Sequence, residues 1–270
     1  MPSATVGGLR MYYEWHGEAP GPPLVLVMGL GGDLTAWGLQ LAAFAPACRC
    51  LVFDNRGAGR SDAPDAPYTI PGMAADLLGL LDALDIPRAH LLGVSMGGAI
   101  VQEAALAAPE RVASLQLHCT WAGPDPFFRA VLESLVAIRR RLDGEALAAA
   151  SLPWLFGPQT YAERPELIEG VRRRVLDPSW PQPLHAYLRQ AEALRAHDAR
   201  ARLPGLRCPT LVTVGADDLV TPLRLARELI RLIPGARLEV IGGGGHGYFW
   251  EVPQAFNAAC LAFLAAQKSA

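Results

Sequence analysis

The stretch AHLLGVSMGGAIVQEAAL at residues 89–106 decides the fold of this chain. Its apolar beginning predicts a buried strand, and its second half predicts a helix. Between them Ser95 lies between Gly93 and Gly97, which is the pattern of a nucleophile elbow. Such a turn is so tight that side chains at either glycine would collide with neighbouring backbone, and it holds the serine in a strained conformation above the sheet. A glycine-rich turn with an incidental serine is the alternative.

Length and composition are those of one folded α/β domain. The chain has 270 residues, of which 51% are hydrophobic and 19% charged, so it is globular and has room for an insertion. Its net charge of −2 gives no sign of a nucleic-acid partner. No apolar run is long enough to span a bilayer, and no secretory signal is recognisable. We therefore expect no membrane partner and a cytoplasmic location.

The five cysteines are scattered along the chain, at Cys48, Cys50, Cys119, Cys208 and Cys260. No C-x-x-C pair occurs, and no cluster of cysteine and histidine has the spacing of a zinc site. We therefore expect reduced thiols that serve packing, no metal site and no cofactor.

Strands and helices alternate along the chain on both sides of the decisive stretch. An antiparallel strand is expected at Leu9–Trp15. Further strands are expected at Leu24–Met28, Cys50–Phe53, Val112–Cys119, Thr210–Val214 and Arg237–Ile241. Helices are expected at Leu34–Phe44, Met73–Leu84, Leu223–Ile233 and Gln254–Ala266. This alternation predicts a mostly parallel sheet with helices on both faces.

The segment from Thr120 to Leu206 breaks this alternation, because it shows helical patterns and no convincing strand. Its prolines predict short helices. They include Pro124, Pro126, Pro153, Pro158, Pro165, Pro178, Pro181 and Pro183. An insertion of this size between two strands predicts a cap over the carboxyl ends of the strands, where open α/β sheets bind ligands. We thus expect a core domain at residues 1–119 and 207–270 and a helical cap at residues 120–206.

A serine nucleophile needs a base, and the base needs a carboxylate that orients it. Of the six histidines, His246 lies in a glycine-rich loop after the last strand and is the expected base, with a structural loop histidine as the alternative interpretation. His118 lies near the end of another strand and could also approach the pocket. The acid should follow the penultimate strand, which carries Asp217 and Asp218. We prefer Asp218 and expect the other aspartate to be a turn residue.

Backbone N–H groups should stabilise the negative charge that develops on the attacked oxygen. One donor is expected from Met96, which follows the serine and begins a helix whose positive end favours an anion. The other is expected from Leu30 in the glycine loop Met28–Gly32. A plain strand-to-helix turn is the alternative interpretation of that loop.

Taken together, four segments resemble the α/β-hydrolase superfamily and its cap-bearing branch of esterases, enol-lactonases and perhydrolases. In the family's order they are Val27–Gly32, Phe53–Asp62, Gly93–Gly98 and the loops that carry Asp218 and His246. The resemblance implies an eight-stranded, mostly parallel sheet and a catalytic triad of Ser95, Asp218 and His246. The chain departs from many relatives in the first loop, where it has Met28–Gly29 in place of His-Gly. A serine at position 95 also differs from the aspartate nucleophile of haloalkane dehalogenases.

We therefore expect a carboxylesterase that acts through an acyl-enzyme, and the apolar cap with the Leu30 and Met96 side chains favours small to medium, fairly apolar substrates. Its partner would be the small-molecule ester, and the chain could be a monomer or a homodimer. Substrate contacts are expected from Gly29, Leu30, Met96, Trp121, Trp154 and Val220. Three alternatives stay open: a perhydrolase with the same triad, a receptor with little turnover, and an enol-lactonase. The lactonase would need a cationic residue, such as Arg129 or Arg189.

Overall fold

A computed structural model gives the structure of residues 2–268. Eight strands form one sheet in the order β1-β2-β4-β3-β5-β6-β7-β8. The strands are β1 (Ser3–Val6), β2 (Leu9–His16), β3 (Leu24–Val27), β4 (Cys50–Phe53), β5 (Ala89–Val94), β6 (Val112–His118), β7 (Thr210–Gly215) and β8 (Arg237–Ile241). β2 runs antiparallel to β1 and β4, and the other neighbours are parallel. The predicted mostly parallel, eight-stranded sheet is confirmed.

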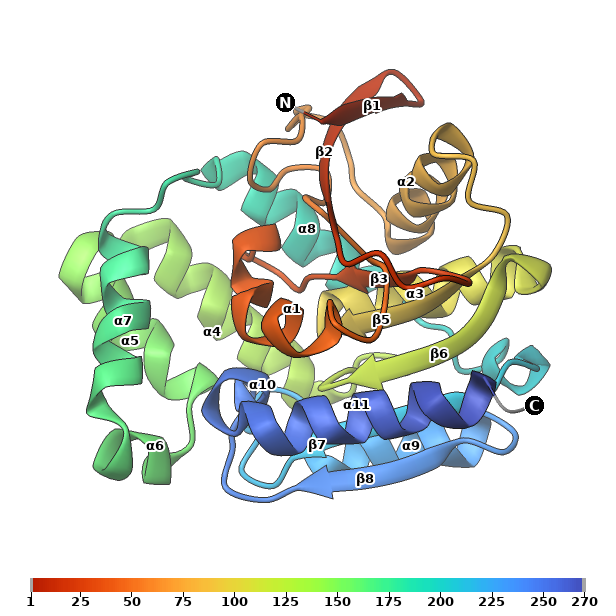
Figure 1. Cartoon of the computed structure of the whole chain (residues 1–270). Helices are drawn as coiled ribbons and strands as arrows, with labels where there is room; N and C mark the ends of the chain where they lie inside the picture. The colour runs from red at the N-terminus through yellow and green to blue at the C-terminus, as the bar shows by residue number, and fades with distance from the viewer. Residues whose placement is uncertain (1, 269–270) are drawn as a thin grey trace.

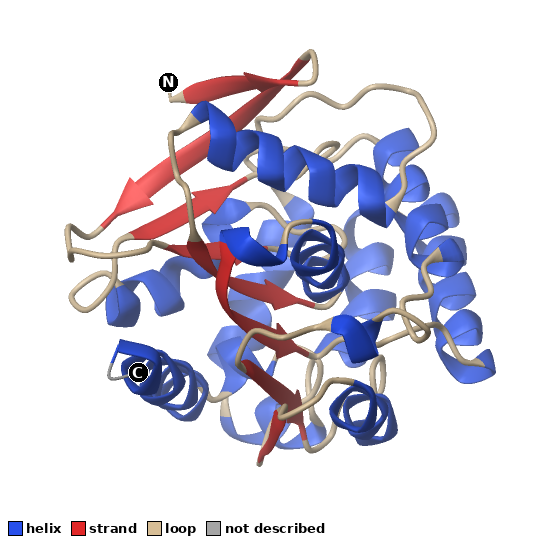
Figure 2. Cartoon of the chain, turned by 90° about the vertical axis from the view of Figure 1, so that its right-hand side faces the viewer, coloured by secondary structure: helices blue, strands red, loops and turns tan. Residues whose placement is uncertain are grey.

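Helices cover both faces of the sheet, as Figure 2 shows. Outside the insertion they are η1 (Leu34–Trp37), α1 (Gly38–Phe44), α2 (Ile70–Ala83), α3 (Met96–Ala107), η2 (Pro109–Arg111), α9 (Leu223–Leu232), α10 (Tyr248–Glu251) and α11 (Pro253–Lys268), while η3 (Leu203–Gly205) lies at the end of the insertion. Buried residues of α2, α3 and α9 share one apolar core, and those of α1 and α11 share a second. Every residue of β3, β4, β5 and β7 is buried, which explains their apolar sequences.

The insertion at residues 120–206 is described throughout and contains helices but no strand. Its main helices are α4 (Pro126–Arg141), α5 (Gly144–Leu155), α6 (Pro158–Glu163), α7 (Pro165–Leu176) and α8 (Leu184–Ala196). In Figure 1 the arrowheads of β6 and β8 point toward α4–α7, so these helices lie beyond the carboxyl ends of the strands.

Prolines divide the insertion in most places but not in all. Pro126, Pro158 and Pro165 are the first residues of α4, α6 and α7, where the missing N–H breaks no helical hydrogen bond. Pro153 departs from the expected pattern, because it lies inside α5. It falls in the last turn of that helix, so the lost hydrogen bond leaves the rest of the helix intact.

The two ends of the insertion lie side by side. The Ala199 N–H donates to Ala122 O at 2.8 Å, and Arg200 Nη2 donates to Gly123 O at 2.6 Å. The chain therefore leaves the core domain and returns to it at nearly the same place.

None of the helices within residues 2–268 is long and apolar enough to cross a membrane. The same residues hold no group of three His, Cys, Asp or Glu side chains arranged to bind a metal ion. None of the five cysteines, all of which lie within the described residues, forms a disulfide, and all except the half-buried Cys208 are buried.

Candidate active site

Ser95 lies at the turn from β5 to α3 with a φ of 52°, a conformation that a residue with a side chain adopts only under strain. The surrounding structure holds this backbone, since the Ser95 N–H donates to His118 O at 2.9 Å. A Cβ added at Gly93 would collide with Gly97 O, and one added at Gly97 would collide with Val27 O. The backbone collisions predicted for these two glycines are therefore confirmed.

Asp218 and His246 form a hydrogen-bonded pair at the neighbouring strand ends. Nδ1 of His246 lies 2.9 Å from Oδ2 and 3.2 Å from Oδ1 of Asp218. The N–H groups of Val220 and Thr221 each donate to Oδ1 at 2.8 Å, and Thr221 Oγ1 donates to Oδ2 at 2.8 Å. This carboxylate is fully enclosed, and all its partners are donors that favour its ionised form.

The pKa of Asp218 follows from these surroundings. Burial raises the pKa, but the charge of His246 and the hydrogen bonds from His246 and Thr221 outweigh burial and hold the pKa below its ordinary value. The carboxylate can thus stabilise a charged imidazole beside it. Asp217 is exposed, and its N–H donates to Gly244 O at 3.0 Å, which ties the aspartate loop to the histidine loop.

The sheet order places these loops at one edge. β5, β6, β7 and β8 are consecutive and parallel, so the loops that carry Ser95, Asp218 and His246 leave the sheet at the same side. Within the described residues no hydrogen bond joins Ser95 Oγ to His246 Nε2. In sites without substrate such contacts are often long and tighten only when substrate binds.

The glycine loop after β3 lies directly against the serine. A Cβ added at Gly29 would lie 3.1 Å from Ser95 Cβ and 3.6 Å from its Oγ. Asn55 Nδ2 donates to Met28 O at 2.9 Å and fixes the start of this loop. The loop therefore lies beside Ser95, which directly precedes α3.

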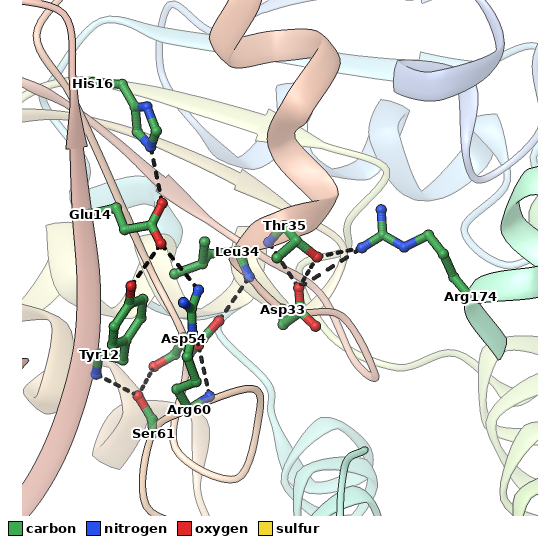
Figure 3. A network of polar contacts seen from close by, with 10 residues as sticks. All are labelled: Tyr12, Glu14, His16, Asp33, Leu34, Thr35, Asp54, Arg60, Ser61 and Arg174. Atoms are coloured by element: carbon green, nitrogen blue, oxygen red, sulfur yellow. Dashed lines mark hydrogen bonds and ion pairs between the residues drawn. The ribbon is translucent and has the colours of Figure 1, made fainter. Parts of the chain in front are cut away.

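A polar network, drawn in Figure 3, holds the far end of this loop. The buried carboxylate of Asp54 accepts from the Leu34 N–H and from the Arg60 N–H, both at 2.8 Å. Burial raises the pKa of Asp54, against the effect of these hydrogen bonds. From the insertion, Arg174 of α7 donates to Thr35 Oγ1 in η1. The segment Phe53–Asp62 thus acts as a support for the glycine loop.

The expected substrate contacts differ in exposure. Met96, Trp121 and Val220 are buried, whereas Leu30 and Trp154 are half-buried. The indole of Trp121 packs on Phe128, with ring centroids 4.4 Å apart, so it has a packing partner inside the protein.

Two insertion residues near the glycine loop, Tyr187 and Arg139, are not among the substrate contacts expected from the sequence. The ring of Tyr187 lies 3.5 Å from the position that a Cβ at Gly31 would take, and burial raises its pKa to about 12. The Arg139 guanidinium lies 5.8 Å from the centroid of that ring and donates to Gln182 O at 3.1 Å. Arg139 is half-buried, and no described carboxylate lies within ion-pair distance of it.

The other candidates suggested by the sequence have structural partners. His118 is fully buried under α11, with Nδ1 2.6 Å from Thr213 Oγ1, and burial lowers its pKa to about 3. It therefore does not approach the pocket, because its ring is enclosed between the sheet and α11. Arg129 Nη1 donates to Arg195 O at 3.1 Å, and Arg189 forms an ion pair with Asp65 at 3.2 Å.

Comparisons with known proteins all match this chain to hydrolases. The profile of a family described as "alpha/beta hydrolase fold" matches residues 22–253. The protein named "Putative carbamate hydrolase RutD" from Azorhizobium caulinodans is 35% identical over 97% of this chain and 98% of its own length. The enol-lactonase from Burkholderia xenovorans LB400 superposes with a TM-score of 0.88 at 33% identity, covering 98% of this chain and 100% of that one. A thermophilic esterase from Thermogutta terrifontis gives a TM-score of 0.86 at 29% identity, with 98% of both chains covered.

Proposed function

The chain belongs to the α/β-hydrolase family, and from this premise we propose that it is a serine hydrolase that cleaves carboxylic esters through an acyl-enzyme. One observation carries the proposal. The buried Asp218–His246 pair leaves the same sheet edge as Ser95, whose positive φ marks a strained turn. A nucleophile, a base and an orienting acid on three neighbouring loops are what acyl transfer requires.

In the proposed reaction, Ser95 Oγ attacks the ester carbonyl carbon while His246 removes the hydroxyl proton. Asp218 keeps Nδ1 protonated and stabilises the imidazolium that forms. The N–H groups of Leu30 and Met96 bind the negative oxygen of the tetrahedral intermediate. His246 then gives its proton to the departing alcohol, and water hydrolyses the acyl-enzyme by the same steps.

The insertion at residues 120–206 serves in this proposal as the cap over the reacting carbonyl. Its helices lie beyond the carboxyl ends of the strands, and Tyr187 of α8 lies over the glycine loop. The apolar side chains of Leu30, Met96 and Val220 favour small to medium, fairly apolar acyl groups.

The test is hydrolysis of p-nitrophenyl esters from acetate to a long acyl chain by the wild type and by Ser95→Ala. The proposal expects turnover that disappears in Ser95→Ala. Ser151→Ala is the matched control, because its hydroxyl bonds only to Leu147 O within α5. Full activity of a folded Ser95→Ala variant would overturn the mechanism. A p-nitrophenyl carbamate in the same panel tests the chemistry that the name of the Azorhizobium relative suggests, since its carbonyl is open to the same attack.

Arg139 favours a second candidate, hydrolysis of an acidic lactone or ester. It is a half-buried cation without a carboxylate partner among the described residues, and it lies against Tyr187 beside the glycine loop. A carboxylate on the substrate would supply the missing partner. If so, Arg139→Gln raises KM for p-nitrophenyl hemisuccinate at least tenfold and leaves KM for p-nitrophenyl butyrate unchanged. Equal effects on both esters would exclude this second candidate.

A further inference from the structure

Glu251 is a buried carboxylate outside the proposed triad, five residues after His246. It ends α10 and is 3% exposed. Its Oε1 accepts from the Gly245 N–H at 2.6 Å, and its Oε2 accepts from the Gly157 N–H at 2.8 Å and from Thr160 Oγ1 at 2.5 Å. Within residues 2–267 no Lys, Arg or His side chain lies within ion-pair distance of this carboxylate. Three hydrogen bonds are therefore its only direct compensation for burial.

The three donors belong to two parts of the molecule. Gly245 directly precedes His246 in the loop after β8, whereas Gly157 and Thr160 lie at the start of α6 in the insertion. On the other side of the histidine, the Gly247 N–H donates to Leu155 O at 2.6 Å. The backbone on each side of His246 is thus bonded either to Glu251 or to the insertion itself.

The two backbones approach closely enough to require glycine. A Cβ added at Gly245 would lie 2.8 Å from Gly157 N and 3.0 Å from Leu155 O. Beside this contact the rings of Phe156 and Trp250 pack with centroids 6.2 Å apart. Neither segment can move far without the other, because a carboxylate, a backbone hydrogen bond and an aromatic contact join them.

Arg164 and Asp217 also act on Glu251, and of these two only Arg164 favours the same arrangement. The Arg164 guanidinium donates to the Glu251 carbonyl oxygen at 2.6 Å, so it holds the end of α10 from outside. Burial raises the pKa of Glu251, while the hydrogen bonds from Thr160, Gly157 and Gly245 lower it, and the nearby Asp217 raises it further. The carboxylate therefore depends on its three donors to stay charged.

We propose that Glu251 is a positioning residue, which fixes the backbone of His246 opposite Ser95 and binds the start of α6 to the same loop. The proposal rests on the function proposed above, in which His246 is the base. It follows that the insertion and the base form one unit, so that a shift of α6 displaces the imidazole. A displacement of about 1 Å at a catalytic group can cost on the order of 100-fold in rate.

The test uses Glu251→Gln, which keeps the shape of the side chain but replaces one acceptor oxygen with an NH2 group that faces an N–H donor. We expect kcat for p-nitrophenyl acetate to fall by about 10- to 100-fold with little change in KM. The proton on His246 Nδ1, observed at low field by NMR without substrate, should shift or broaden. Glu103→Gln is the matched control, because it alters another buried carboxylate and should change neither readout.

The NMR signal separates failure of this proposal from failure of the proposed function. It reports the Asp218–His246 hydrogen bond even if no ester is hydrolysed. A folded Glu251→Gln variant with an unchanged signal and kcat within twofold of the wild type would overturn the positioning role.

A milder variant keeps the proposal testable if Glu251→Gln does not fold. Thr160→Val removes a single donor and preserves both backbone contacts. A few-fold loss of kcat and a smaller shift of the same signal would support the proposal. No change in either would overturn it.

Discussion

Two buried carboxylate–histidine pairs in this molecule have the same separation and different surroundings. Asp218 Oδ2 lies 2.9 Å from His246 Nδ1, and Glu103 Oε1 lies 2.9 Å from His197 Nε2. Glu103 also binds the guanidinium of Arg202, whereas the other partners of Asp218 are N–H and hydroxyl donors. Glu103 is therefore neutralised by a permanent charge, and Asp218 is not.

The second imidazole nitrogen separates the two pairs further. The side chain of His197 is 1% exposed, and its Nδ1 is enclosed without a hydrogen-bond partner among the described residues. That of His246 is 10% exposed and lies at the sheet edge with Ser95. A hydrogen bond to a carboxylate thus does not by itself make a histidine a base, which also needs a second nitrogen within reach of a nucleophile.

The sharpest test of this contrast replaces each histidine in turn. We expect His246→Ala to lower kcat by about 10⁴- to 10⁶-fold, because the proton of Ser95 then has no acceptor. His197→Ala should lose stability while it keeps kcat within a few-fold. Turnover of p-nitrophenyl acetate and thermal unfolding measure the two effects. An active His246→Ala variant would contradict the assignment of the base.

The two carboxylates should differ as the two histidines do: replacing Asp218 should lower activity, and replacing Glu103 should lower stability. Asp218→Asn is expected to lower kcat by about 10⁴-fold, since an amide favours the wrong imidazole tautomer. Glu103→Gln should leave kcat nearly unchanged and reduce the free energy of unfolding by about 1.5–3 kcal/mol, the usual contribution of hydrogen bonds to charged groups. Urea denaturation measures the effect on stability, and ester turnover measures the effect on activity. Equal loss of activity in both variants would contradict the proposed difference between the two carboxylates.

Acid should weaken the contacts of Glu103 with His197 and Arg202 in a defined pH range. Burial raises the pKa of Glu103, but His197 and Arg202 outweigh burial and lower it from 4.5 to about 2. Because the folded pKa is depressed, the stabilisation is complete above pH 4.5 and is lost as the pH falls toward 2. Urea midpoints between pH 7 and pH 3 should therefore fall less for Glu103→Gln than for the wild type. If the urea midpoints of both proteins fell equally with pH, protonation of Glu103 would not be the cause of the lost stability.

The smallest expected effect concerns one hydrogen bond to Asp218. Thr221→Val removes the hydroxyl that donates to Oδ2 and leaves both backbone donors in place. A loss of about 1 kcal/mol in positioning corresponds to roughly a fivefold decrease in kcat. Thr210→Val is the control, because its hydroxyl bonds only to Cys208 O. A decrease equal to that of Asp218→Asn would mean that the hydroxyl, not the turn backbone, holds the acid.

The sequence predicted the alternation of strands and helices because buried parallel strands and amphipathic helices leave local patterns. It did not reveal β1, since four residues with only Val6 buried make too short a pattern. The helix expected at Leu34–Phe44 begins as the 3-10 helix η1, where the Asp33 side chain accepts from the Thr35 N–H. Such local choices depend on side-chain contacts rather than on hydrophobic period.

At the candidate site, sequence reasoning selected Ser95, Asp218 and His246 because each follows a strand that must end at the same edge. It could not find Glu251, whose partner Gly157 is 94 residues away, or Arg139 beside Tyr187. Hydrophobic periodicity predicts which faces are buried, but it does not determine which distant polar groups meet once those faces pack.

The adjacent ends of the insertion have a consequence for how such a chain can vary. β6 and β7 are neighbours in register, with Leu115 opposite Thr210, while the intervening chain leaves and returns between Ala122 and Ala199. A segment whose ends meet can be lengthened, shortened or exchanged without drawing those strands apart. The sheet can thus keep its strand pairing while the covering above it changes, provided that the new covering still supplies donors to Glu251 beside the His246 loop.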